Sequence, residues 1–203
     1  GEFCYFDAYQ DAPHTQPEAF GGYLPLQKVY AYEPIPDTID VDQASLLYGI
    51  QGNLFAEYIP TEEHMEYMAY PRILALAEVA WSVPENKDYA CFRARAIEAV
   101  NYLRSQGYNA FDLEHEVGNR PGADQHLQHL GVGKQVSYVD GCRYYPGYAA
   151  GGDAALVNGV RGGWTYGDKC WQGFLGRKGI DVVVDLEEVM PIREVNADFM
   201  QIC

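Results

Sequence analysis

Two short stretches of the sequence place aromatic and acidic side chains at a spacing that suits a binding site. Tyr5 and Asp7 lie two residues apart in YFDAYQ. Phe55 and Glu57 lie two residues apart in NLFAEYI. On a β-strand, this spacing puts both side chains of a pair on one face. A sugar suits such groups, because its apolar face stacks on a ring while its hydroxyls donate to a carboxylate. Structural roles fit the same spacing: a surface hydrogen bond for the first pair, and pairing with Arg72 or helix capping for Glu57.

Other chemistries find less support in the sequence. His126 and His129 are three residues apart and could share a helical face, but no H-E-x-x-H frame accompanies them, and solvated histidines fit equally well. There is no phosphate-binding, dinucleotide-binding or nucleophile-elbow motif. We therefore expect no metal and no cofactor. The five cysteines are scattered, which predicts free thiols, with a Cys142–Cys170 bridge as the alternative.

The composition narrows the classes of partner. The 203 residues carry a formal charge of −15, from 14 Lys and Arg against 29 Asp and Glu. This balance argues against nucleic acid and against an anionic membrane surface, since both require clustered basic residues. No apolar run approaches the roughly 20 residues of a membrane span. The 17 Tyr, 8 Phe and 3 Trp are typical of proteins that handle sugars, although ordinary packing also uses them.

The first half of the chain has the pattern of an α/β protein. Residues 3–9 predict a strand, and residues 10–45 hold five prolines and predict a long irregular segment. Residues 46–55 are almost all apolar, which favours a buried strand of a parallel sheet. Helical spacing then predicts one helix over 62–81, bent near 67–70 by Pro71, and another over 88–106.

The pattern changes after about residue 120. Short β-type runs at 136–138, 155–157, 180–186 and 195–202 alternate with glycine-rich turns. We predict an all-β sandwich from these runs. The expected organisation is a first domain over 1–118, a linker over 119–134 and part of a sandwich over 135–203.

Four segments together resemble the β-N-acetylhexosaminidases of glycoside hydrolase family 20. GIQGNLFAEYI and PRILALAEVAW resemble the last barrel strand and helix of that family, and YFDAYQ resembles an earlier Y-x-D element. The loop GGYLPLQKVYAYEPIP resembles the one that follows this element. The resemblance covers about residues 3–107. It implies an α/β fold: the C-terminal portion of a (β/α)8 TIM barrel, followed here by the partial all-β sandwich.

The resemblance also implies an activity and residue roles. The family hydrolyses terminal β-linked N-acetylglucosamine or N-acetylgalactosamine with retention, using the substrate's acetamide oxygen as nucleophile. Tyr5 would be catalytic by hydrogen-bonding that oxygen. Asp7 would bind a hydroxyl, at C6, and Glu57 the C4 hydroxyl. Phe55 stands where the family usually has tryptophan, which puts tight binding at that subsite in doubt.

The same resemblance sets expectations for the complete protein. The family's Asp-Glu catalytic pair is not in this sequence, so we expect it upstream of residue 1 and expect this chain alone to be inactive. The partners would be N-acetylhexosamine-containing glycans. Such hydrolases usually work in the periplasm or after secretion. The alternative is a non-catalytic carbohydrate-binding or scaffold protein with a degenerate barrel, which Phe55 in place of tryptophan favours.

Residues 144–175 resemble a second family, the discoidin-like (F5/8 type C) β-sandwiches often appended to such hydrolases. Asn158 replaces the usual aspartate before Gly159, which weakens the case for a structural calcium ion. Trp164 and Trp171 are candidate sugar platforms, although a core role suits one of them. The sandwich would either bind sugar or brace the barrel.

Overall fold

The structure is a computed structural model that describes residues 2–123, 125–139, 141–176 and 179–200. The chain divides into two compact units, Gly1–Gly118 and Asn119–Cys203. The first unit contains the α-helices α1 (Leu26–Tyr30), α2 (Val41–Ala44), α3 (Glu62–Ala69), α4 (Arg72–Trp81) and α5 (Tyr89–Ser105). Its 3-10 helices are Pro13–Thr15, Ala56–Tyr58, Pro84–Asn86 and Leu113–His115. The second unit contains the strands β1 (Gln135–Tyr138) and β2 (Val182–Asp185), and the 3-10 helices Pro146–Tyr148, Asp153–Val157 and Tyr166–Asp168.

The long helices form where the sequence predicts them. The Thr61 hydroxyl accepts the backbone N–H of His64 at 3.1 Å and so caps the start of α3. Asp88 caps α5 in the same way through the N–H of Cys91, also at 3.1 Å. The expected bend at Pro71 is a complete break, since α3 ends at Ala69 and α4 begins at Arg72. The peptide between Tyr70 and Pro71 is cis.

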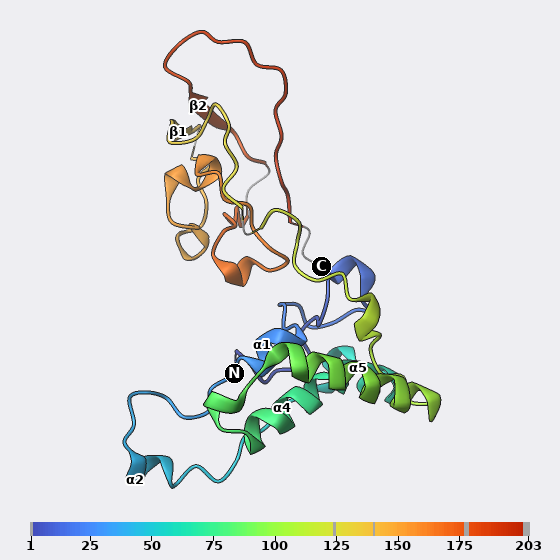
Figure 1. Cartoon of the computed structure of the whole chain (residues 1–203). Coiled ribbons are helices and arrows are strands. Elements are labelled where there is room, and N and C mark those ends of the chain that lie inside the picture. The colour runs from blue at the N-terminus through green and yellow to red at the C-terminus, as the bar shows by residue number, and fades with distance from the viewer. Residues whose placement is uncertain (1, 124, 140, 177–178, 201–203) are drawn as a thin grey trace. The chain divides into compact units, whose positions relative to one another are not determined.

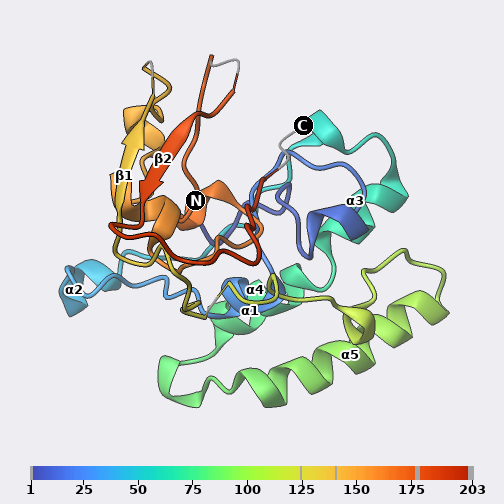
Figure 2. The ribbon, with the colours of Figure 1, turned by 90° about the horizontal axis from the view of Figure 1, so that it is seen from above.

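One hydrophobic core fills the centre of the first unit. Helices α1 and α4 pack side by side, as Figures 1 and 2 show, whereas α2 lies on an extended loop away from them. The ring of Tyr30 on α1 stacks on that of Phe92 on α5, with 4.6 Å between the centroids. The core consists of the buried residues Cys4, Phe6, Leu24, Leu26, Val29, Tyr30, Ala75, Leu76, Phe92, Ala96, Phe111 and Leu113. The polypeptide on either side of Phe6 is therefore anchored in this core.

The strands predicted for residues 3–9 and 46–55 are wrong. Within the part of this unit that the structure describes, these segments form only isolated parallel bridges, Tyr5 with Asn53 and Tyr9 with Tyr23. The first bridge consists of two hydrogen bonds, from Phe6 N to Asn53 O at 2.8 Å and from Asn53 N to Cys4 O at 2.7 Å. A parallel strand needs neighbours that continue the ladder, and among the described residues these segments have only each other at this point.

The second unit contains a short antiparallel sheet. Strands β1 and β2 pair with Gln135 opposite Asp185 and Tyr138 opposite Val182. The strands predicted at 136–138 and within 180–186 are thus confirmed. The strand predicted at 155–157 is wrong, because these residues lie in a 3-10 helix; short apolar runs do not distinguish the two by periodicity. Residues 195–200 form no strand, and 201–203 lie outside the described residues.

The described residues contain neither a disulfide bond nor a membrane-spanning helix. Cys4, Cys91, Cys142 and Cys170 are free, so the alternative Cys142–Cys170 bridge is absent; Cys203 is not among the described residues. Among the described residues, no helix has both the length and the apolar character needed to cross a bilayer.

Candidate functional site

Tyr5 and Phe55 come together at the surface of the first unit. Their rings stack with centroids 5.8 Å apart and an interplanar angle of 28°. Both rings are accessible, with 41% and 54% of the residue exposed. The bridge between Tyr5 and Asn53 brings them together, because Phe55 lies two residues after Asn53. Two of the four predicted site residues therefore present adjoining aromatic faces to solvent.

Asp7 lies in a turn rather than on the predicted strand. The N–H of Ala8 donates to the carbonyl of Tyr5 at 3.4 Å, and Phe6 and Asp7 occupy the centre of the turn. Asp7 is buried, with 8% of its surface exposed, whereas Tyr5 is not. Its Oδ1 atom is buried and has no hydrogen-bond partner among the described residues. The expected common face for Tyr5 and Asp7 is thus absent, and Asp7 is instead an unsatisfied acceptor.

Glu57 is exposed on the short 3-10 helix Ala56–Tyr58. Among the described residues, it makes no ion pair or side-chain hydrogen bond. The alternative pairing of Glu57 with Arg72 is wrong, because the Arg72 guanidinium is directed to backbone carbonyls elsewhere. Glu57 therefore offers both carboxylate oxygens to a ligand.

Arg72 is the most deeply buried charge near these residues. Its side chain is fully buried at the start of α4 and donates to the carbonyls of Phe6, Ala8, Leu24 and Met68. Its guanidinium also lies 5.2 Å from the centre of the Phe6 ring.

Burial lowers the pKa of Arg72 to about 9, and nearby Asp7 opposes this effect. Arg72 is therefore cationic at neutral pH. From the sequence, Arg72 is named as a possible partner of Glu57 and is given no other role. The signal for its burial is that Arg72 is the one cation of an apolar helix.

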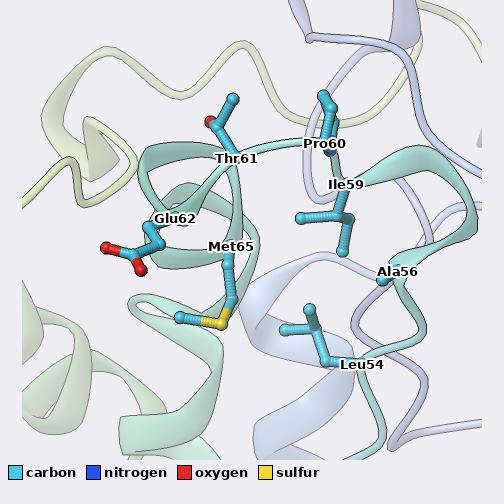
Figure 3. A pocket seen from close by; sticks show the side chains of 7 residues that line it. All are labelled: Leu54, Ala56, Ile59, Pro60, Thr61, Glu62 and Met65. Carbon is cyan, nitrogen blue, oxygen red and sulfur yellow. The ribbon is translucent and has the colours of Figure 1, made fainter.

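A shallow apolar cavity of about 280 Å³ is lined by residues that are close to Phe55 and Glu57 in the sequence. It is lined by Leu54, Ala56, Ile59, Pro60, Thr61, Glu62 and Met65. Figure 3 shows the side chains of Leu54, Ile59 and Met65 around the hollow, with the Glu62 carboxylate directed away from Ile59. None of the four predicted site residues lines it. The cavity has few polar groups to orient a sugar, so the accessible rings and the carboxylates are the better candidate site.

The candidate residues of the second unit have different environments. Trp164 is half-buried. Trp171 packs beneath the Arg120 guanidinium, 5.2 Å from its ring, and its Nε1 is buried without a partner. A Cβ on Gly162 would lie 2.0 Å from that nitrogen, so only glycine fits there. Asn158 accepts the N–H of Val160 at 2.8 Å through its side chain. Trp171 thus packs internally, as expected for one of the two tryptophans.

No grouping of histidine, cysteine and acidic residues suited to a metal ion occurs in the part of the chain that the structure describes. Instead, the carboxylates of Asp7 and Glu57 provide hydrogen-bond acceptors. The stacked rings of Tyr5 and Phe55 provide an apolar platform. Such groups recognise a neutral polyol with one apolar face.

These features can be compared with those of known proteins. Residues 1–84 match the catalytic domain of glycosyl hydrolase family 20. This match supports the resemblance drawn from the sequence motifs. The matched residues include Tyr5, Asp7, Phe55 and Glu57.

The similar proteins are β-hexosaminidases. The chain is 45% identical over 105 residues to a beta-hexosaminidase of Porphyromonas gingivalis, which covers 52% of this chain and 14% of the relative. It is 38% identical over 79 residues to a beta-hexosaminidase of Vibrio furnissii, covering 38% of this chain and 13% of the relative. Among solved structures, a family 20 exo-β-N-acetylglucosaminidase from Vibrio harveyi, in complex with N-acetylglucosamine, gives a TM-score of 0.47 at 32% identity. That match covers 56% of this chain and 18% of the other. The chain thus spans a small part of the length of these relatives.

Proposed function

We propose that this chain is part of an exo-acting β-N-acetylhexosaminidase and supplies one wall of its sugar site. The observation that carries the proposal is the exposed Tyr5–Phe55 stack inside the segment that matches the family 20 catalytic domain. The first unit would be the C-terminal portion of a (β/α)8 barrel. The substrates would be glycans that end in β-linked N-acetylglucosamine or N-acetylgalactosamine, met in the periplasm or outside the cell.

In this proposal each residue acts on a different part of the sugar. The Tyr5 hydroxyl donates to the acetamide oxygen as that oxygen attacks the anomeric carbon, which stabilises charge that develops in the transition state. Phe55 stacks on the apolar face, Asp7 accepts from the C6 hydroxyl, and Glu57 accepts from the C4 hydroxyl. The general acid would come from an Asp-Glu pair outside this chain, because the sequence contains no adjacent Asp-Glu.

Hydrolysis of a chromogenic β-N-acetylglucosaminide tests the proposal. The complete protein that contains this chain should cleave it, and the 203-residue chain alone should not. Tyr5→Phe in the complete protein should lower kcat more than it raises KM, because the hydroxyl acts in the transition state. Tyr48→Phe is the matched control, since Tyr48 is 95% exposed in the same unit. A complete protein without turnover would leave the non-catalytic sugar-binding alternative, and turnover by the chain alone would contradict the need for an external acid.

A second function, sugar binding by the second unit, has its own support. We propose that this unit is the start of a discoidin-like sandwich whose accessible rings bind a glycan. Tyr145, Tyr148 and Tyr166 form a contiguous cluster with centroids 6.1 and 5.6 Å apart, and each is more than a third exposed. Their hydroxyls make no hydrogen bond within the described residues, whereas those of Tyr138 and Tyr144 donate to side chains of the same unit.

Titration of the chain with chitooligosaccharides, followed by NMR, tests this second function. Tyr166→Ala should weaken binding by roughly tenfold, because loss of a stacking ring costs about 1 kcal/mol or more. Tyr102→Ala, on α5 of the first unit, is the control with a similarly exposed ring. Equal affinities of the two variants would favour the bracing role instead.

A further inference from the structure

Arg72 uses all of its hydrogen-bonding capacity on backbone carbonyls, two of which belong to the neighbours of Asp7. Nε donates to Met68 O at 3.1 Å, and one terminal nitrogen donates to Ala8 O at 2.8 Å and to Leu24 O at 3.2 Å. The other terminal nitrogen donates to Phe6 O, and to Met68 O at 2.6 Å. A guanidinium has no donor beyond these five. The cation is therefore satisfied entirely by carbonyl groups.

Two of these carbonyls belong to the residues on either side of Asp7. The hydrogen bond to Phe6 O fixes the peptide plane that precedes Asp7, and the bond to Ala8 O fixes the plane between Ala8 and Tyr9, one peptide beyond the plane that follows Asp7. The Phe6 ring beneath the guanidinium is itself held in the core, at 2% exposure. Arg72 at the start of α4 thus restrains the backbone on both sides of Asp7, and with it the direction of the Asp7 side chain.

The same arrangement leaves the Asp7 carboxylate without a partner. Because every donor of Arg72 is occupied, none remains for Asp7, and no ion pair joins the two residues in the part of the chain that the structure describes. Asp7 Oδ1 is buried and unsatisfied. An unsatisfied buried acceptor is costly and gains the most from a donor that arrives with a ligand.

We propose that Arg72 is a positioning residue of the sugar site, which restrains the backbone around Asp7 without pairing with its carboxylate, so that the carboxylate can accept a sugar hydroxyl. This inference rests on the proposed function and adds a residue to it. Lysine cannot replace arginine here, because an ammonium has three donors on a single atom and cannot span four carbonyls.

The test compares two substrates in the complete protein: an aryl β-N-acetylglucosaminide and its 6-deoxy analogue. The unmodified protein should prefer the first by roughly 10–100-fold in kcat/KM, the value of a hydrogen bond to a charged group. Arg72→Lys should reduce this preference to about threefold or less, with a larger loss for the hydroxylated substrate. A purely structural defect would lower both rates equally and leave the preference unchanged. Arg95→Lys is the matched control, because Arg95 is half-exposed and pairs with Glu78 instead.

A second measurement covers the case in which Arg72→Lys does not fold. In the unmodified protein, the NMR resonance of the Arg72 Nε–H group should move when N-acetylglucosamine binds and should stay in place with its 6-deoxy analogue. An unchanged resonance with both sugars, or an unchanged substrate preference in folded Arg72→Lys, would overturn the role of Arg72 alone. An unmodified protein that neither cleaves nor binds these sugars would overturn the proposed function, and this inference with it.

Discussion

At the scale of single residues, buried polar groups hold the segment that follows Asp7. Both oxygens of Asp11 accept backbone N–H groups near the end of the first unit, from Val117 at 2.7 Å and from Gly118 at 2.8 Å. Gln10 donates to the carbonyl of Tyr67 at 2.6 Å. These side chains lie in an irregular stretch without periodicity, so their burial has no signal in the sequence. The candidate site therefore depends on partners far away in the chain.

Gly52 is the position where an added methyl group should be felt most at this site. A Cβ there would lie 2.8 Å from Cε2 of Phe6 and 3.1 Å from Cδ2 of Leu76. Because Phe6 is anchored in the core and contacts Arg72, we expect Gly52→Ala to cost about 1–3 kcal/mol of unfolding free energy. Gly49→Ala is the control, since nothing lies within 4 Å of its Cβ position. Urea unfolding of both variants measures the difference, and equal midpoints would show that the Phe6 ring moves aside without cost.

At the scale of elements, the long helices of the first unit were predictable, whereas the strands predicted in that unit were not found. The apolar spacing predicts the ends of α5 to within one residue, and it predicts the outer ends of the pair α3 and α4, with Pro71 marking the break between them. The apolar run 46–55 has no such local determinant, because a buried parallel strand depends on neighbouring strands that the local sequence does not supply. The spacing of Tyr5 with Asp7 was misleading for the same reason, whereas the nearness of Tyr5 to Phe55 is a tertiary contact. Of the candidate site, the residue types were readable from the sequence, but their burial was not.

The cap at Asp88 should contribute measurably to α5. Its carboxylate satisfies the N–H of Cys91, one of the donors that a helix start leaves without an intrahelical partner. We expect Asp88→Ala to lower the free energy of unfolding by about 1 kcal/mol and Asp88→Asn to change it far less, because asparagine also caps helices. Circular dichroism during urea unfolding of the two variants gives the comparison. Identical losses for alanine and asparagine would mean that the side-chain cap is not used in solution.

At the scale of the whole molecule, each of the two units is stabilised internally by a different kind of interaction. The first has extended hydrophobic clusters. In the described part of the second, the core hydrophobic residues are Val136 and Val157. Polar contacts connect its distant segments instead: Asp198 accepts from Arg161 at 2.8 and 3.0 Å and pairs with Arg120 at 3.0 Å. Since a small core gives little stability, we expect unfolding in two transitions, with the second unit melting first.

Asp198 should make the lower transition depend on pH. Its hydrogen bonds with Arg161, and then with Arg120, hold the pKa of the Asp198 carboxyl below its ordinary value. A lowered folded-state pKa gives stability that is present above the unfolded pKa of about 3.9 and is lost as the pH falls through the folded value. At pH 7, Asp198→Asn should therefore destabilise only the lower transition, by less than about 1 kcal/mol because the group is partly exposed. The difference should shrink as the pH falls below about 4. Asp181→Asn is the control, because Asp181 is an exposed aspartate of the same unit whose side chain makes no bond to any described residue. Calorimetric scans in which the difference does not shrink as the pH falls below about 4, or in which the upper transition shifts, would contradict this assignment.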